Sequence, residues 1–303
     1  GRITIDRLVD KGYPKAYACA LVAAGACTGI LIPPSISYII IGLVLGISAS
    51  TLFLAAAIPG VLVLMSVMVT NFLVNRVMKY EDSRGQFDVK HWLKTVWDGR
   101  YALLIPFIIL GGIYSGIFTP TESASVAVIA TLIIGFYQKT INLSDVPKML
   151  ETSAKVSGVI VPIIAMSLPF AQTLAALEVP QYFVYVMTSM TENRYLIMLS
   201  MIAILIIAGC VMETTPNIVI LAPILMPLAL EIGMNDIHFC IFMVSALGIG
   251  FITPPLGLNL FVVSGVSGEP VMAISRHAIY FVFTMLAVVI LIMSVPAIAL
   301  WLL

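Results

Sequence analysis

Two pairs of adjacent prolines, Pro33-Pro34 and Pro254-Pro255, interrupt stretches of sequence that are otherwise apolar. Proline has no backbone N–H and its ring clashes with the preceding helical turn, so each pair leaves carbonyl groups without helical partners. Hard cations take oxygen ligands, and a sodium ion is one way to satisfy such carbonyls in an apolar setting. The sequence therefore predicts a cluster of oxygen ligands at each proline pair.

The orphaned carbonyls fall around 29–32 and 250–253. Hydroxyl and amide side chains accompany them: Ser35 and Ser37 after the first break, Thr253 and Asn259 at the second, and Thr214, Thr215 and Asn217 in a facing hairpin tip. Helices that restart after Pro34 and Pro255 direct positive N-terminal ends to the same level, which suits a carboxylate. The alternative is a pair of proline kinks that only shape the packing.

Two carboxylates, Glu122 and Glu213, lie in apolar stretches. Glu122 follows Thr119-Pro120-Thr121, which resembles a helix start, so an N-terminal cap competes with a functional role. Glu213 stands next to the hairpin tip and has three candidate roles: supporting the tip through backbone N–H groups, binding a cation, or carrying a proton. Support of the tip is favoured.

The elements that hold these groups are predicted to be membrane-spanning helices. The chain has 303 residues, of which 61% are hydrophobic and 10% charged, against about 25% charged in a soluble domain. Its mean hydropathy is +1.11. Several runs are long enough to cross a bilayer: 53–75, 101–118, 121–137, 156–177, 196–212 and 279–302. None alternates with the period of two that a membrane barrel requires.

Several function classes are not supported by the sequence. The net charge is zero and no basic block is interleaved with aromatic residues, so nothing indicates nucleic-acid binding. No HExxH, GxSxG or P-loop pattern is present, and the chain is not expected to be an enzyme. Cysteines without CxxC spacing are predicted to be small packing residues: Cys19, Cys27, Cys210 and Cys240. The histidines are predicted to be solvated in loops: His91, His238 and His277.

The positions of Lys and Arg predict the topology. A path that starts inside and crosses through 16–46, and later dips from outside as a hairpin at 195–230, leaves fourteen of the fifteen Lys and Arg on the cytoplasmic side. The C-terminus is then periplasmic. Three prolines within the hairpin segment, Pro216, Pro223 and Pro227, favour a broken, re-entrant hairpin over two regular spans.

The proline pairs belong to an internal repeat. The shift that places Pro33-Pro34 on Pro254-Pro255 also aligns Gly12 with Gly233 and Gly29 with Gly250. Cations precede the first copy and acidic residues the second, so the repeats are predicted to be inverted in the membrane. Inverted repeats with discontinuous helices are typical of secondary transporters. The counterpart of the hairpin tip falls upstream of Gly1, so an N-terminal part of the protein is expected to lie outside this chain.

Four motifs identify a family. The stretches "GILIPPSI", "GIFTPTESA", "ILAPILMPLA" and "IGFITPPLGLNLFV" closely resemble the large membrane subunit of tripartite ATP-independent periplasmic (TRAP) transporters. The similarity runs along essentially the whole chain. Large subunits of this family are normally longer at the N-terminus, which agrees with the expected missing part.

The resemblance implies an all-α polytopic membrane protein with inverted repeats, re-entrant hairpins and two discontinuous helices, working as an elevator. It implies sodium-coupled uptake of an organic acid (a C4-dicarboxylate, a sialic or other sugar acid, or a keto acid), with no cofactor besides Na⁺ as coupling ion. The implied partners are a small four-helix membrane subunit and a periplasmic substrate-binding protein. The implied location is the bacterial inner membrane, as a multi-pass protein in contact with lipid.

Site residues follow from the same resemblance. The first sodium site is expected at Gly29, Ile32, Pro33 and Ser35. The second is expected at Thr214, Thr215, Asn217, Thr253, Gly257 and Asn259. The substrate is expected near Pro34, Ser37, Pro216, Pro254 and Pro255, with Glu122 and Glu213 as supporting residues.

The expected division of the chain is as follows. It comprises the end of the first hairpin and the first broken helix (1–52), a scaffold helix with a cytoplasmic interfacial arm (53–100), helices that open the second repeat (101–194), the second hairpin and broken helix (195–266), and a C-terminal scaffold helix (267–303). The main alternative function is a stand-alone sodium-coupled divalent-anion symporter. An intramembrane enzyme and a non-transporting scaffold are the more distant alternatives.

Overall fold

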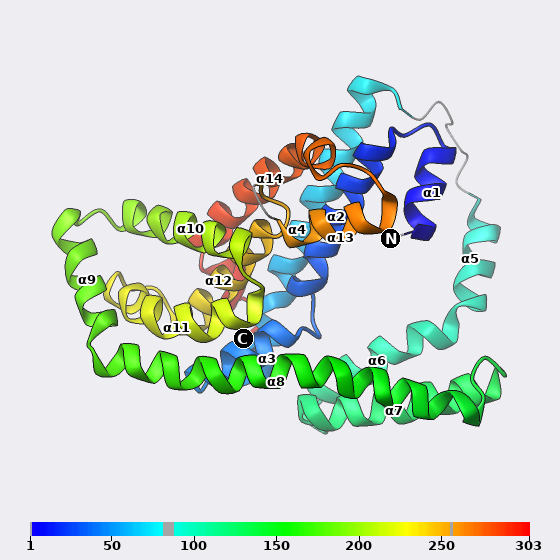
Figure 1. The fold of residues 1–303 in the computed structure, drawn as a ribbon, viewed down its shortest axis with the longest axis horizontal. Coiled ribbons are helices and arrows are strands. Elements are labelled where there is room, and N and C mark those ends of the chain that lie inside the picture. Colours follow the sequence, from blue (N-terminus) through cyan, green and yellow to red (C-terminus); the bar gives the residue numbers. More distant parts are fainter. Residues whose placement is uncertain (1, 81–87, 255–256) are drawn as a thin grey trace. The chain divides into compact units, whose positions relative to one another are not determined.

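A computed structural model describes residues 2–80, 88–254 and 257–303, which form helices and no strand (Figure 1). Within these residues, six helices are long and apolar enough to cross a membrane, or up to eight if each of two bent helix pairs counts as one span. The prediction of an all-helical polytopic membrane protein is therefore confirmed.

The helices fall into two similar series with a connecting group between them. The first series is α1 (Arg2–Asp10), α2 (Lys15–Leu31), α3 (Ile36–Leu45) and α4 (Ala49–Met78). The second is α10 (Arg194–Val211), α11 (Thr214–Glu231), α12 (Asp236–Gly250), α13 (Leu258–Ser267) and α14 (Val271–Ser294), followed by the short α15 (Ala297–Leu300). The connecting group is α5 (Val89–Asp98), α6 (Arg100–Tyr114), α7 (Pro120–Tyr137), the 3-10 helix η1 (Leu143–Asp145), α8 (Val146–Ala176) and α9 (Val179–Met190).

The sequence repeat extends to the helices and to their ends. The helix α12 begins where the repeat aligns the start of α2, and α13 and α14 each begin one residue beyond the positions aligned with the starts of α3 and α4. Gly12 and Gly233 follow α1 and α11 with φ of +97° and +76°. In each case the N–H of the next residue donates to the carbonyl five residues earlier, at 3.1 and 2.9 Å. Glycine is favoured there because the left-handed conformation that closes such a helix end strains other residues.

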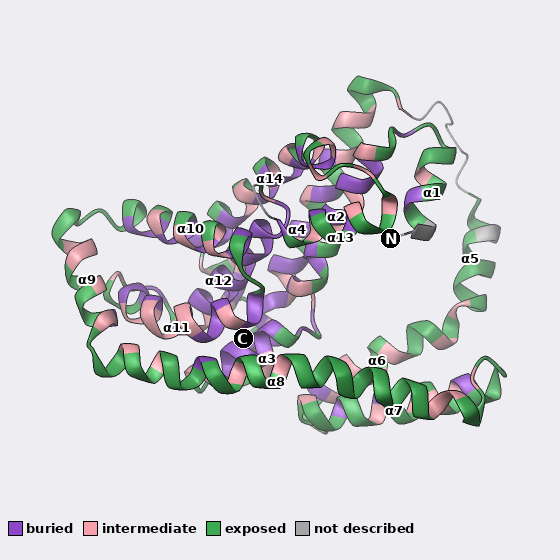
Figure 2. Ribbon diagram, viewed as in Figure 1, coloured by how far each residue is buried: buried purple, intermediate pink, exposed green. Residues whose placement is uncertain are grey.

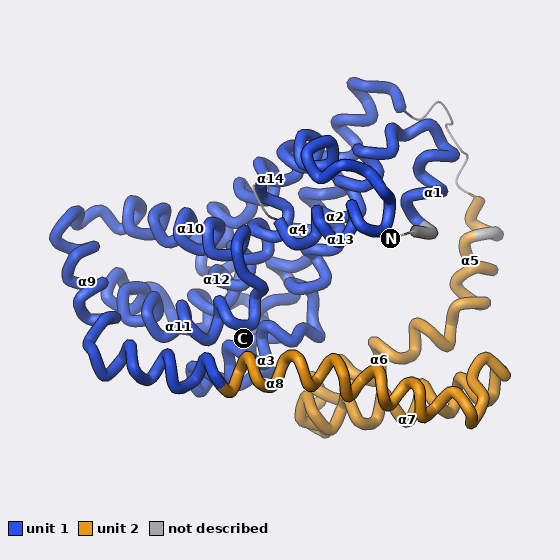
Figure 3. The backbone as a smooth tube through the Cα atoms, viewed as in Figure 1, with its two compact units in different colours: residues 1–83, 166–303 blue, residues 84–165 orange. Residues whose placement is uncertain are grey.

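The chain divides into two compact units: unit 1 is Gly1–Ser83 and Met166–Leu303, and unit 2 is Arg84–Ala165 (Figure 3). The helices α4 and α14 were expected in a scaffold separate from the broken helices. Both lie in unit 1, where they pack on each other and on α2 and α12. Small residues allow this approach, since Ala55, Ala56 and Gly60 are buried on α4. The broken helices and these long helices therefore share one core.

The core of unit 1 is centred on α12 (Figure 2). Every residue of α12 from His238 to Gly250 is buried. Five helices pack most closely around it: α2, α4, α10, α11 and α14. A helix that is apolar all round lies either in a protein core or against lipid, and the neighbouring helices place α12 in the core.

Unit 2 is more open by comparison. The helices α6 and α7 pack together as a pair, and α5 contacts α6. A helix, α5, occupies the segment in which an interfacial helix was expected, with Trp92 and Trp97 exposed. Most of α7 and of α8, whose first part belongs to this unit, is exposed (Figure 2).

The structure corrects three helix predictions. The last span, expected at 279–302, ends at Ser294 because Pro296 cannot continue the hydrogen-bond ladder and holds Val295 out of the helical conformation. The helix α11 runs through Pro223 and Pro227 without ending, so the break of the hairpin lies before it, at residues 212–213. The helix α9 was not predicted.

Candidate functional site

The hairpin between α10 and α11 turns at Glu213, which caps α11. The Glu213 carboxylate accepts a hydrogen bond from the Thr215 N–H at 3.1 Å and lies 3.4 Å from the Thr215 hydroxyl, which donates to it. A carboxylate at this position satisfies the first N–H groups of a helix and is stabilised by the helix dipole. This arrangement matches the supporting role favoured for Glu213.

Asn217 closes the hairpin from inside. Its side-chain amide donates to the carbonyls of Ala208 and Met212, at 3.1 and 3.0 Å, and the residue is 1% exposed. Pro216 has no N–H, so the backbone offers the Met212 carbonyl no donor four residues later. The Asn217 side-chain NH₂ group supplies that donor, and its hydrogen bonds do not use the side-chain carbonyl oxygen.

The second break is tied to the same end of α10. The Gly257 N–H donates to the Cys210 carbonyl at 3.3 Å, and the Asn259 N–H donates to the Phe251 carbonyl at 3.0 Å. The Thr253 hydroxyl donates to the Ile249 carbonyl at 2.8 Å, which leaves its oxygen lone pairs available. The last turn of α10 thus connects the hairpin tip and the second break, the two groups of residues predicted to form the second site.

Two glycines allow this close approach. A Cβ on Gly250 would lie 2.5 Å from the carbonyl carbon of Gly209 and 2.8 Å from the N of Cys210. A Cβ on Gly209 would lie 2.7 Å from the Leu247 carbonyl oxygen. The backbones of α10 and α12 are therefore in direct contact where the second break begins.

The first break lies between α2 and α3, whose axes differ by 41°. The Ser35 hydroxyl donates to the Ile30 carbonyl at 2.5 Å, and Ser35 is buried. Gly60 of α4 lies opposite, where a Cβ would be 3.1 Å from the Leu31 carbonyl oxygen. The Ser35 hydroxyl and the carbonyls of Ile30 and Leu31 therefore lie at the first break.

The remaining predicted residues of the first break and of the substrate vicinity differ in exposure. Buried residues are Pro33 and Ser37, and half-buried residues are Ile32 and Pro216. Exposed residues are Gly29, Pro34 and Pro254. Pro255 lies outside the described residues. No hydrogen bond within the described ranges joins side chains of the first predicted site to those of the second.

Two buried hydroxyls near the breaks have no hydrogen-bond partner among the described residues: Thr214 Oγ1 at the start of α11, and the Tyr38 hydroxyl in α3. Leaving a buried hydroxyl unpaired costs about 1–3 kcal/mol. Such groups in a native structure call for an explanation, and a missing ion or ligand is one.

Glu122 lies in unit 2 and forms a capping box at the start of α7. Its carboxylate accepts from the Thr119 N–H at 2.8 Å, and the Thr119 hydroxyl accepts from the Glu122 N–H at 3.4 Å. These reciprocal bonds satisfy two free donors of the helix end. They match the cap interpretation of the "GIFTPTESA" motif.

The prediction of solvated histidines was wrong for His238. Asn235 caps α12, which places His238 in the first turn of that buried helix. Its Nε2 lies 2.7 Å from the Ile292 carbonyl of α14, and the side chain is fully buried. His277 is half-buried in α14 with its ring edge-on to Tyr17. The four cysteines are buried free thiols.

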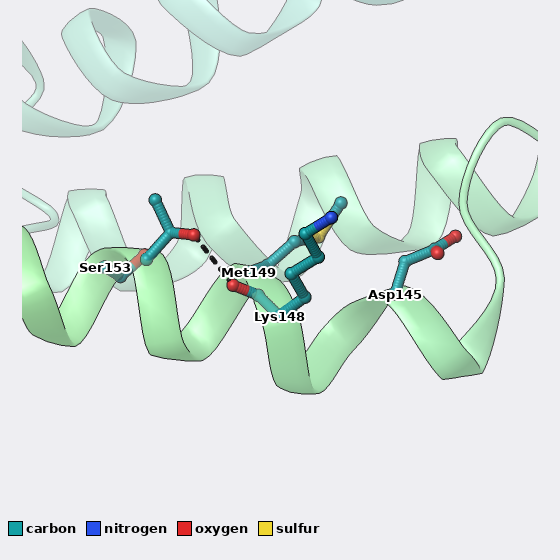
Figure 4. A pocket seen from close by; sticks show the side chains of 5 residues that line it. Asp145, Lys148, Met149 and Ser153 are labelled. Atoms are coloured by element: carbon teal, nitrogen blue, oxygen red, sulfur yellow. Dashed lines mark hydrogen bonds between the residues drawn. The ribbon is translucent and has the colours of Figure 1, made fainter.

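Unit 2 contains a hollow of about 450 Å³ at the start of α8 (Figure 4). Its lining comes from one stretch of chain: Asp145, Lys148, Met149, Thr152 and Ser153. Asp145 already accepts from the Asn142 N–H at 2.9 Å, and the Thr152 hydroxyl donates to the Lys148 carbonyl at 2.8 Å. A depression on one helix face whose polar groups are partly paired is a weaker candidate site than the two breaks.

Sequence reasoning missed the contacts between the two repeats. The Asn259 side-chain amide donates to the Ala23 carbonyl of α2 at 3.2 Å and to Cys27 Sγ at 3.4 Å. Nothing in the spacing of these residues indicates that contact. The small residues Gly209 and Cys210, directly before the hairpin tip, were the available signal for the close approach of α10 and α12.

Comparisons with known proteins agree along the chain. Residues 1–298 match the family described as "Tripartite ATP-independent periplasmic transporter, DctM component". The chain is 38% identical over 301 residues to the C4-dicarboxylate TRAP transporter large permease protein DctM of Pseudomonas aeruginosa, covering 99% of this chain and 70% of that protein. It is 35% identical over 299 residues to the isethionate TRAP transporter permease protein DctMQ of Oleidesulfovibrio alaskensis, covering 98% of this chain and 47% of that protein.

A third relative has another substrate in its name. The chain is 31% identical over 282 residues to the sialic acid TRAP transporter large permease protein SiaM of Vibrio cholerae, covering 91% of this chain and 65% of that protein. The chain thus spans about half the length of the isethionate permease and about two thirds of the other two.

Proposed function

Since the chain belongs to the DctM component family of tripartite ATP-independent periplasmic transporters, we propose that it forms the ion-binding and solute-binding core of a sodium-coupled organic-acid uptake system. The observation that carries this proposal is the junction at the end of α10, where the hairpin tip and the second break meet through Asn217 and Gly257. Carbonyl, hydroxyl and amide oxygens gather there in an apolar core.

Sodium suits the oxygen ligands at this junction better than a transition metal does. Among the described residues no group of three or more His, Cys, Asp and Glu is placed to hold a metal ion. The available ligands are neutral oxygens: the hydroxyls of Thr214, Thr215 and Thr253 and the carbonyl oxygens of Asn217 and Asn259. Hard cations favour such ligands. The first site would use Ser35 and the carbonyls of residues 29–32, with ligands from outside this chain.

An organic anion is the proposed solute. The names of three relatives give isethionate, C4-dicarboxylate and sialic acid as their substrates, all of which are acids. The helices α3, α11 and α13 begin at or beside the breaks and direct N-terminal N–H groups toward them. Helix ends and hydroxyls would bind the carboxylate, since no Lys or Arg lies within residues 16–46, 195–230 or 239–266.

The proposed mechanism is an elevator built from inverted repeats. The matching starts of the two helix series support a duplication, and cations before the first copy against acids before the second support opposite orientations. Because α4 and α14 pack into unit 1 with the broken helices, we assign unit 1 to the moving part and unit 2 to the scaffold. This assignment differs from the division expected from the sequence.

The proposed assembly is a bacterial inner-membrane complex with a small four-helix membrane subunit and a periplasmic binding protein. The name of the Oleidesulfovibrio relative combines two components, DctM and DctQ. The C-terminus is proposed to be periplasmic.

Reconstitution tests the proposed function. The full permease, with its small subunit and its binding protein, is placed in proteoliposomes, and uptake of a radiolabelled organic acid is measured with an inward sodium gradient. Uptake is expected only when both the sodium gradient and the binding protein are present. Uptake without the binding protein would favour the stand-alone symporter, and uptake driven by protons in sodium-free buffer would reject sodium coupling.

Thr215→Ala and Thr253→Ala test the second site. Each removes one hydroxyl oxygen near the junction and is expected to raise the sodium concentration for half-maximal uptake by about tenfold, as for a ligand worth about 1.4 kcal/mol. The matched control is Thr131→Ala in unit 2, where the hydroxyl donates to the Ala127 carbonyl four residues earlier, as Thr253 does to Ile249. An unchanged sodium dependence in both site variants would reject this site.

A further inference from the structure

Asn259 is the residue through which the two repeats share a polar contact beside both breaks. Its backbone N–H donates to the Phe251 carbonyl and so spans the second break. Its side-chain amide reaches the Ala23 carbonyl and the Cys27 thiol of α2, within three turns of the first break. The Cys27 thiol in turn donates to the Ala23 carbonyl at 3.5 Å, so three groups form one closed set of hydrogen bonds.

The geometry points to Asn259 as a positioning residue that couples the two breaks, so that sodium at the second site favours sodium binding at the first. This inference rests on the proposed sodium-coupled transport. It goes beyond the role of Asn259 as an oxygen ligand, because it assigns the function to the opposite end of the carboxamide, the NH₂ group that contacts α2.

The carboxamide has the chemistry that such coupling needs. Both amide hydrogens are used on α2, which leaves the carbonyl oxygen of the side chain as the end that points elsewhere. A cation on that oxygen polarises the amide and strengthens the hydrogen bonds that the NH₂ group donates. Ala23 and Cys27 are fully buried and Asn259 is half-buried, so water screens these bonds less than it screens hydrogen bonds on an exposed surface. Sodium binding at the second break thereby strengthens the hydrogen bonds that hold α2, the helix that ends at the first break.

The first repeat also has a polar residue at the position that corresponds to Asn259. The shift that superimposes the proline pairs aligns Asn259 with Tyr38, in α3 after the first break. Tyr38 is fully buried in α3, which packs on α12, and its hydroxyl has no hydrogen-bond partner among the described residues. Each half-helix that follows a break therefore carries a polar side chain at the aligned position and packs on the broken helix of the other repeat. Only the Asn259 contact is a complete hydrogen bond among the described residues.

The deciding variant is Asn259→Asp, made in the full permease with its small subunit and binding protein. Aspartate keeps oxygen ligands for sodium, but an ionised carboxylate cannot donate to the Ala23 carbonyl. Two coupled sites give a Hill coefficient of up to about 2 in the sodium dependence of uptake. The expected result is a fall of the Hill coefficient toward 1, while sodium still stimulates uptake.

Cys27→Val provides a second test that leaves every proposed sodium ligand in place. Valine has no acceptor for the amide and adds a methyl group beside it, so the Hill coefficient is again expected to fall toward 1. Cys27→Ser is the matched control, since its hydroxyl both accepts and donates, and it is expected to keep the wild-type steepness. Thermal unfolding of each purified variant shows whether the fold is intact.

The outcomes separate this inference from the proposed function. If the wild-type system shows no sodium dependence, the proposed function fails and the coupling with it. If the wild-type curve is sigmoidal and folded Asn259→Asp and Cys27→Val keep the same Hill coefficient, the coupling is overturned and the proposed function stands. A parallel shift of the sodium curve without loss of steepness in Asn259→Asp would make Asn259 a ligand only, and would also overturn it.

Discussion

Replacing Gly250 by alanine is expected to abolish uptake and to lower the free energy of unfolding by about 3 kcal/mol, the upper part of the range for overpacking a core. The added Cβ would lie 2.5 Å from the carbonyl carbon of Gly209 and 2.6 Å from its Cα. Both are backbone atoms, which cannot rotate away as a side chain can. The helices α10 and α12 would have to separate.

This separation would act on function as well as on stability. The Gly257 N–H donates to the Cys210 carbonyl, one residue beyond Gly209, so a shift of α10 pulls the second break away from the hairpin tip. Uptake and solute-stimulated sodium binding are therefore expected to fall together with the melting temperature. Fluorescence-monitored unfolding of the purified permease and uptake in proteoliposomes measure the two effects.

The matched control for Gly250→Ala is Gly248→Ala, two residues earlier on the same buried helix. A Cβ there would meet only the Leu31 side chain, at 3.9–4.0 Å, which is ordinary contact. Near wild-type uptake and stability are expected. If Gly250→Ala behaved like Gly248→Ala, the direct backbone contact between α10 and α12 would be contradicted.

Asn217→Leu is also expected to abolish uptake, for a different reason. Leucine fills nearly the same space but donates nothing, so the Met212 carbonyl at the hairpin turn loses its side-chain donor. An unpaired buried polar group costs about 1–3 kcal/mol, and because Met212 is 39% exposed, the lower end of this range is expected for its carbonyl. Because Pro216 supplies no N–H, the backbone cannot replace the lost bond. The hairpin tip is expected to lose its fixed geometry, and uptake to be lost with it.

Ser245→Ala is the control for removing a buried polar group. The Ser245 hydroxyl is fully buried and donates to the Ile241 carbonyl four residues earlier, within α12. That carbonyl belongs to the regular helix ladder, so little is expected to change when the hydroxyl is removed. Digestion of the purified permease with proteinase K, which does not require Lys or Arg, adds a direct measure, since a loosened hairpin is expected to be cut faster in Asn217→Leu alone. Equal digestion rates would argue against the proposed closing role.

Much of the local structure could be predicted from interactions between neighbouring residues in the sequence. The proline pairs, the Thr-Pro-Thr-Glu helix start and the hairpin around Thr214-Thr215-Pro216 each depend on neighbouring residues, and each has its expected kind of structure where it is described. The alignment of the two repeats located matching helix starts in both series. These features follow from the missing N–H of proline and from helix capping, which act within a few residues.

Contacts between distant helices could not be obtained in this way. Nothing local to His238 shows that α14 covers it, and nothing local to Asn259 shows that Ala23 lies opposite. The placement of α4 and α14 with the broken helices depends on which apolar face meets which, and both helices are apolar on most sides. A uniformly apolar helix gives no periodic signal for its partner.

The burial of α12 on every side limits the ways in which the second break can open. A helix enclosed by five neighbouring helices cannot turn without leaving vacancies in a closely packed core. By contrast, only Leu260 and Val263 are buried on α13. We therefore expect α13, and not α12, to change its position when the second break opens.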